Sequence, residues 1–121
     1  MPQSLSKVDI HCVFFTKKDM PLITNAIRKD LHAYIIGTLS NIGPPEADEI
    51  YANPDHIHVL CTLPRTITVS ELISKIKTGS TKWIKRQGIT NFSWQGGYGV
   101  FSVSSSKVKV VERYIQNQPC V

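Results

Sequence analysis

Long apolar segments and paired cysteines are both missing from this 121-residue sequence. Without a run of about 18 consecutive apolar residues, we expect no membrane-spanning helix. The N-terminus lacks the basic start, apolar block and small-residue cleavage site of a signal peptide. The three cysteines, Cys12, Cys61 and Cys120, are widely spaced and form no C-x-x-C pair, which argues against a disulfide framework or a cysteine zinc site. We therefore expect buried thiols in a protein of the cytoplasm.

Acidic residues are also scarce, since 9 Asp and Glu stand against 14 Lys and Arg, for a formal net charge of +5. A basic balance of this size permits a polyanionic partner without establishing one. Internal repeats, low-complexity tracts and linkers are absent, and 121 residues suit one domain spanning residues 1–121. Hydrophobic residues make up 41% of the chain, enough for an ordinary core.

Seven segments have the periodicity of strands or helices, in the order strand, helix, strand, strand, helix, strand, helix: residues 8–16, 19–37, 46–52, 56–63, 68–87, 100–103 and 107–118. We expect Asp19 to cap the first helix, with Pro21 in its first turn. Thr68 and Glu71 form a capping box at the start of the second helix, and Gly88 ends it.

The order βαββαβ, followed by a helix, predicts an α+β fold of the ferredoxin-like, split βαβ type. A four-stranded antiparallel sheet would carry both long helices on one face, with residues 46–52 as an edge strand. The other face is then open to a ligand or to the C-terminal helix.

The segment DHIHVL places two histidines in an otherwise apolar strand. Because side chains alternate along a strand, His56 and His58 point to one face, about 6–7 Å apart, while Ile57 and Val59 point to the other. Two imidazoles so placed can bind one divalent ion. The alternative is a pair of structural or surface histidines.

The last helix carries Val108, Val111 and Ile115 as its core stripe. Tyr114 and Gln118 are spaced i, i+4, so they lie one above the other beside that stripe. A packed tyrosine and a solvated glutamine would be an ordinary alternative. Together with the histidine pair, however, these residues suggest one site.

The chemistry of such a site is consistent with phosphoryl transfer. A phenol has a pKa near 10 and is a poor nucleophile at neutral pH unless an ion polarises the phosphate that it attacks. Two imidazoles and the Gln118 amide oxygen would leave metal positions open for a phosphate. Mg²⁺ and Mn²⁺ both suit these donors, and Mn²⁺ accepts imidazole more readily.

Several motifs resemble one family. The His56-Ile57-His58 triplet resembles the histidine-hydrophobic-histidine motif of HUH single-strand nucleases. RYIQNQ resembles the tyrosine helix of the IS200/IS605-type single-tyrosine (Y1) HUH transposases. Three further segments also look like that family: HCVFFTK at 11–17, SELISKIKTGSTKW at 70–83 and SWQGGYGVFSVS at 93–104.

This resemblance implies a metal-dependent nuclease and strand transferase that acts on single-stranded DNA with hairpins at transposon ends. By position, Tyr114 on a helix of about 105–118 would become linked to a 5′-phosphate and release a 3′-OH. His56, His58 and Gln118 would bind Mg²⁺ or Mn²⁺. The resemblance also implies a homodimer in which the tyrosine helix of one subunit completes the site of its partner, and no membrane. Pro119 is expected to end that helix.

Supporting roles are predicted for a further group of residues. His11 and Asp55 are candidates to orient the metal-binding histidines, although His11 is equally compatible with a structural role and Asp55 with fixing the turn. The candidates for nucleic-acid contacts are Lys75, Lys77, Lys82, Lys85, Arg86 and Trp94. The cations could instead form a solvated helix face. Trp94, Tyr98 and Phe101 could stack on bases. Of these, Trp94 is open between stacking and packing, and we expect Phe101 to pack in the core.

Two rival functions also fit parts of this sequence. A degenerate or truncated family member would be a DNA- or RNA-binding module without cleavage. A two-histidine phosphoesterase would need a second H-x-T or H-x-S motif, and the chain has none. A purely structural protein leaves the combination of His56, His58, Tyr114 and Gln118 unexplained.

Overall fold

The computed structural model describes residues 8–43, 47–103 and 107–116 of the chain. Its strands and helices follow the predicted order: β1 (Asp9–Phe15), α1 (Asn25–Ile42), β2 (Ala47–Asn53), β3 (His56–Thr62), α2 (Val69–Arg86), β4 (Gly99–Val103) and α3 (Val108–Gln116). A short 3₁₀ turn, Lys17–Asp19, follows β1.

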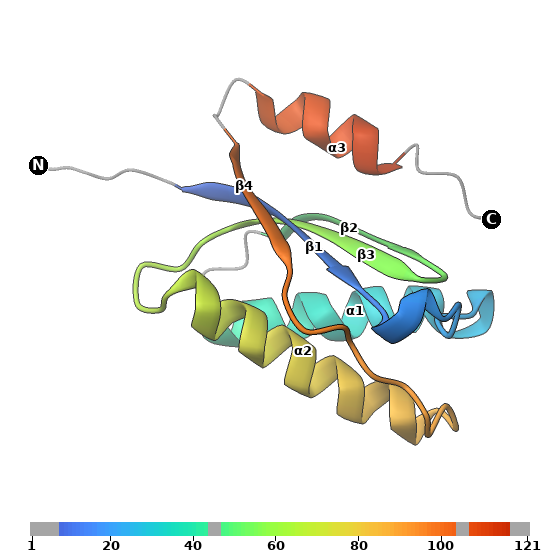
Figure 1. Ribbon diagram of the computed structural model, residues 1–121. Helices are drawn as coiled ribbons and strands as arrows, with labels where there is room; N and C mark the ends of the chain where they lie inside the picture. The colour runs from blue at the N-terminus through green and yellow to red at the C-terminus, as the bar shows by residue number, and fades with distance from the viewer. Residues whose placement is uncertain (1–7, 44–46, 104–106, 117–121) are drawn as a thin grey trace, which may run out of the picture.

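The four strands form one antiparallel sheet in the order β2-β3-β1-β4, which confirms the ferredoxin-like prediction and the edge position of β2. Helices α1 and α2 lie side by side on one face of the sheet, and α3 lies over the opposite face (Figure 1). The molecule therefore has three layers, with the sheet in the middle.

The main core lies between the sheet and the α1–α2 layer, because every second residue of β1 and β3 points into it. Its buried members on the two central strands are Ile10, Cys12, Phe14, Ile57, Val59 and Cys61. The helices contribute Leu31, Ile35, Leu39, Leu72, Ile73, Ile76 and Ile84. Burial raises the pKa of the Cys12 thiol to about 12, so this thiol is inert at neutral pH. In the described segments, no helix has both the length and the apolarity to cross a lipid bilayer.

The start of α1 differs from the prediction. We expected Asp19 to cap the helix, but Lys18 and Asp19 both have positive φ values, 57° and 55°, and the helix begins at Asn25 with Thr24 as its N-cap. The reason is a tertiary contact. The Thr16 hydroxyl bonds the carbonyls of Met20 and Asp55, so the chain after β1 is held against the β2–β3 turn before it turns into the helix.

The start of α2 agrees with the prediction. The Thr68 hydroxyl accepts a hydrogen bond from the Glu71 backbone N–H, and the Glu71 carboxylate accepts one from the Thr68 N–H. These bonds lower the pKa of Glu71. At the other end, Gln87 is the C-cap and Gly88 follows with φ of 98°, a conformation that favours glycine.

Candidate active site

The central strands bring three histidines together on the sheet face opposite α1 and α2. His56 and His58 share a face of β3, as predicted, and their ring centroids are 5.1 Å apart. His11 on the neighbouring β1 lies beside them, with its ring centroid 5.1 Å from that of His58. The cluster thus joins positions 47 residues apart in the sequence.

His58 is the buried member of the cluster, with 5% of its surface exposed. Burial, and then the neighbouring His11 and His56, lower the pKa of His58 to about 4, so its ring is neutral at pH 7. Its Nδ1 atom is 2.9 Å from His11 Nε2, within hydrogen-bond distance. Its Nε2 atom is buried and has no hydrogen-bond partner among the described residues. Buried polar atoms are almost always satisfied, so this atom is a candidate to bind a ligand.

His56 is oriented by its neighbours at the β2–β3 turn. Its Nδ1 lies 2.7 Å from an Asp55 carboxylate oxygen, which can only accept, so Nδ1 donates the hydrogen bond. The proton is therefore on Nδ1, and Nε2 keeps its lone pair. That lone pair lies 3.1 Å from the Asn53 side-chain nitrogen and accepts a hydrogen bond from it.

Helix α3 places Tyr114 over this cluster. The Tyr114 ring centroid lies 5.9 Å from that of His58 and 6.4 Å from that of His11, with near-perpendicular rings in both pairs. Ile115 is fully buried and fixes the helix against the sheet, whereas Tyr114 is 56% exposed. A half-exposed phenol beside a buried imidazole is accessible to a macromolecular substrate. Gln118, which we predicted to be the third metal ligand, lies outside the described residues.

The histidine donors fit a divalent metal ion. His58 supplies an unpartnered Nε2 atom, and His56 supplies a second Nε2 once the Asn53 amide turns away. A metal-binding histidine usually donates a hydrogen bond from its other ring nitrogen to a carboxylate or a similar group. Asp55 is such a partner for His56 Nδ1. In the part of the chain that the structure describes, no group of three His, Cys, Asp or Glu side chains is arranged to hold a metal. A complete site would therefore need a further ligand.

Comparison with known proteins agrees with this architecture. A family model described as "Transposase IS200 like" matches residues 4–118. The chain belongs to the IS200-like transposase family. No curated protein sequence matches it.

Two solved structures share the IS200-like fold. One, from Deinococcus radiodurans, is described as a candidate transposase; it has 18% sequence identity and a TM-score of 0.74, and the match covers 100% of this chain and 98% of that one. The other is a REP-associated tyrosine transposase bound to a REP hairpin, with 20% identity and a TM-score of 0.66, covering 95% of this chain and 68% of that one. Identities this low establish the fold only.

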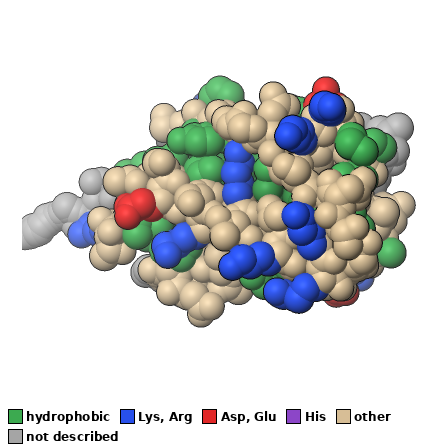
Figure 2. Space-filling view, turned by 60° about the horizontal axis from the view of Figure 1, so that its bottom comes forward, with side chains coloured by type: hydrophobic (Ala, Val, Ile, Leu, Met, Phe, Trp, Pro, Cys, Tyr) green, Lys and Arg blue, Asp and Glu red, His purple; other side chains and the backbone are tan. Residues whose placement is uncertain are grey.

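The predicted DNA-binding cations of this IS200-like transposase all lie on α2, across the sheet from the histidines. That helix has five basic residues and one acidic residue, Glu71. The basic side chains that are exposed there are Lys75, Lys82, Lys85 and Arg86. Figure 2 shows several Lys and Arg side chains spread over this face of the molecule, with few acidic ones. The cations therefore line a second surface and not the histidine site.

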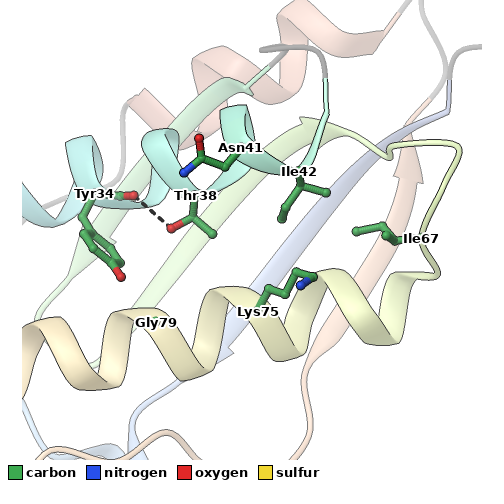
Figure 3. A pocket seen from close by; sticks show the side chains of 7 residues that line it. All are labelled: Tyr34, Thr38, Asn41, Ile42, Ile67, Lys75 and Gly79. Atoms are coloured by element: carbon green, nitrogen blue, oxygen red, sulfur yellow. Dashed lines mark hydrogen bonds between the residues drawn. The ribbon is translucent and has the colours of Figure 1, made fainter.

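A groove of about 460 Å³ opens on the same helical layer, between α1 and α2. Tyr34, Thr38, Asn41, Ile42, Ile67, Lys75 and Gly79 line it (Figure 3). Its lining mixes apolar and polar groups, and Lys75 is its only cation among the described residues. Lys75 therefore lies at a groove of the helical layer, and none of the lining residues belongs to the histidine cluster.

Two residues predicted to contact DNA make contacts within the chain. Trp94 is only 8% exposed, packs edge-on against Phe14 and Phe92, and donates its indole N–H to Ser80 Oγ at 3.0 Å, so it cannot stack on a base. Lys77 donates to two carbonyl oxygens of the loop before β4, at 2.9 and 2.8 Å. Lys77 therefore holds that loop against α2.

The prediction for Phe101 is also wrong. We expected core packing, but Phe101 is 59% exposed on the histidine face of the sheet, and Phe15 on the same face is 42% exposed. Sequence reasoning missed Phe15 and Asn53 as parts of this face. Strand alternation from His11 could have placed Phe15 there, since both are odd-numbered residues of β1. Asn53 gave no comparable signal.

Proposed function

We propose that the protein is a metal-dependent single-stranded DNA endonuclease and strand transferase that cuts at the ends of a mobile element. The observation that carries this proposal is the position of Tyr114 over the histidine cluster, 5.9 Å from His58 between ring centroids. Tyr114 can act as the nucleophile on this surface. His58 Nε2, which has no hydrogen-bond partner among the described residues, and His56 Nε2, which accepts from Asn53, can form the metal-binding pair. Membership of the IS200-like transposase family supports the same chemistry.

In the proposed reaction, the Tyr114 oxygen attacks a backbone phosphorus and forms a phosphotyrosine bond to the 5′ side of the DNA. The bond from phosphorus to the 3′ oxygen breaks, and that oxygen takes up a proton to leave as a 3′-OH. Rejoining is the reverse: a 3′-OH attacks the phosphotyrosine and releases Tyr114. The covalent intermediate conserves the bond energy, so no external energy source is required.

The chain prepares the histidines for this task through hydrogen bonds. Asp55 holds His56 in the tautomer whose Nε2 is unprotonated. We infer that His58 Nδ1 donates to His11 Nε2, which leaves the buried His58 Nε2 free to bind. With Gln118 as a third ligand, these atoms would hold Mg²⁺ or Mn²⁺, which would supply positive charge to the scissile phosphate.

The face of the molecule formed by α1 and α2 is proposed to bind the DNA hairpin. One structural neighbour is a transposase bound to a REP hairpin, and a folded stem presents two phosphate backbones. Lys82, Lys85 and Arg86 are exposed on α2 and would neutralise phosphates without reading sequence. On this proposal, the hairpin stem and the cleaved single strand occupy opposite sides of the sheet.

The proposal is tested by incubating the protein with hairpin-containing single-stranded DNA and Mn²⁺ or Mg²⁺, followed by denaturing electrophoresis. We expect a covalent protein–DNA adduct that is lost in Tyr114→Phe and in His58→Ala. Hairpin binding without any adduct, across a panel of element-end sequences, would favour the binding module instead.

We also propose a homodimer, the assembly that the family resemblance implies. In the structure, Tyr114 lies over the histidines of its own chain. If catalysis uses this arrangement, mixing Tyr114→Phe subunits with His58→Ala subunits will not restore cleavage. Restored cleavage would mean that the tyrosine acts in the partner subunit. Sedimentation measures the dimer itself.

A further inference from the structure

Two exposed phenyl rings share the sheet face that carries the histidine cluster. Phe15 is 42% exposed and Phe101 is 59% exposed, whereas Phe14 and Phe92 are buried, with exposed fractions of 0% and 1%. A single exposed phenylalanine is unremarkable on a protein surface. Two of them beside a candidate active site suggest a surface that is covered when the substrate binds.

The register of the strands places these rings on either side of the histidines. On β1, His11 and Phe15 are four residues apart on one face, which corresponds to about 13 Å. Phe15 pairs with His56 and stacks on its ring, with centroids 5.2 Å apart and planes inclined by 24°. Phe101 on β4 pairs with His11, with ring centroids 6.1 Å apart.

We propose that Phe15 and Phe101 form a stacking platform for unpaired bases on the two sides of the scissile phosphate. This inference rests on the proposed nuclease function and adds to it a means of holding the single strand. With the scissile phosphate at Tyr114, the neighbouring bases would lie over the sheet face that carries the two rings. Aromatic rings stack on any base, so the platform holds single strands without selecting a sequence.

Charge on α3 supports a nucleic-acid strand as the occupant of this face. Lys109 and Arg113 are exposed on the helix that carries Tyr114, and their i, i+4 spacing places them on one side of it. Cations and exposed aromatic rings together form the usual combination of a single-strand binding surface. A protein partner, or a second copy of the chain packed on β4, would not require them.

The test compares two fluorescent probes with the same phosphates: an oligothymidine of about 12 nucleotides and its fully abasic counterpart. Binding is measured by anisotropy in the Tyr114→Phe background, which cannot cleave under the proposal. We expect tighter binding of oligothymidine, and a roughly 5- to 100-fold loss in Phe15→Ala and in Phe101→Ala, with unchanged binding of the abasic probe. Phe101→Trp should retain the preference for bases.

Val110→Ala is the matched control, because Val110 is an equally exposed apolar residue, at 58%, on α3. It should leave both affinities unchanged, and thermal unfolding should show that each variant folds. The platform is refuted if the protein does not prefer oligothymidine, if the phenylalanine variants lose affinity for both probes equally, or if Phe101→Ala acts only by dissociating a dimer in sedimentation.

The adduct assay separates this inference from the proposed function. An adduct with the native protein, but no base-dependent loss in the phenylalanine variants, would reject the platform and retain the nuclease. If the phenylalanine variants lose affinity for oligothymidine alone and the native protein forms no adduct, the platform would be retained on a protein that only binds DNA.

Discussion

Acid should destabilise the metal-free protein largely through His58. Burial lowers the pKa of this residue from 6.5 to about 4 in the folded state. Because the folded pKa is depressed, the unfolded chain binds the proton more tightly. The stabilising contribution is therefore complete above pH 6.5 and decreases as the pH falls toward 4. Each pH unit in this window removes about 1.4 kcal/mol, so the loss is about 2 kcal/mol between pH 6.5 and pH 5.

The assay is urea unfolding of the native protein and of His58→Gln at several pH values, with a chelator present to exclude metal. The glutamine retains an amide that can hydrogen-bond to His11 but does not titrate. Burial also lowers the pKa of His11 and of His32, so both proteins should lose some stability in acid. The native protein should lose about 2 kcal/mol more than the variant at pH 5. Equal pH slopes for the two proteins would refute the buried, neutral state of His58.

Three further predictions concern metal, DNA and the core. In calorimetry at pH 7.5, Mn²⁺ should raise the melting temperature of the native protein but not that of His56→Ala. The Asn53→Ala variant should bind Mn²⁺ at least as well as the native protein, because the Asn53 amide competes with the metal for His56 Nε2. Weaker Mn²⁺ binding by Asn53→Ala would contradict that geometry. Lys85→Gln should weaken hairpin binding and reduce the slope of log affinity against log salt by about one; an unchanged slope would remove Lys85 from the interface. Ser80→Ala should cost about 1–3 kcal/mol in urea unfolding, because the buried Trp94 indole N–H loses its acceptor; a change within error would show that the indole finds another.

Local sequence patterns predicted the parts of the fold that depend on periodicity. Alternation along β1 and β3 identified which residues share a face, so His56 and His58 were placed together correctly. The order of strands and helices then restricted the sheet topology to the ferredoxin-like arrangement. The capping box at Thr68 is likewise a local feature.

The errors arose where tertiary contacts override local preference. Asp19 has the chemistry of a helix cap, but the Thr16 hydroxyl holds the segment against the β2–β3 turn. Alternation could assign Phe101 to a face, but it could not reveal that α3 leaves that part of the face exposed. Trp94 was ambiguous from sequence because its partner, Ser80, lies on α2 and is brought close only by the fold.

In the proposed reaction, Tyr114 carries the DNA during cleavage. The most direct measurement is mass spectrometry of protease digests of the protein after incubation with hairpin-containing single-stranded DNA and Mn²⁺. We expect a peptide in which Tyr114 is linked to the 5′-phosphate of the DNA, together with a new 3′-OH on the released strand. Cleavage with the DNA joined to another residue, or with no covalent link to the protein, would contradict it.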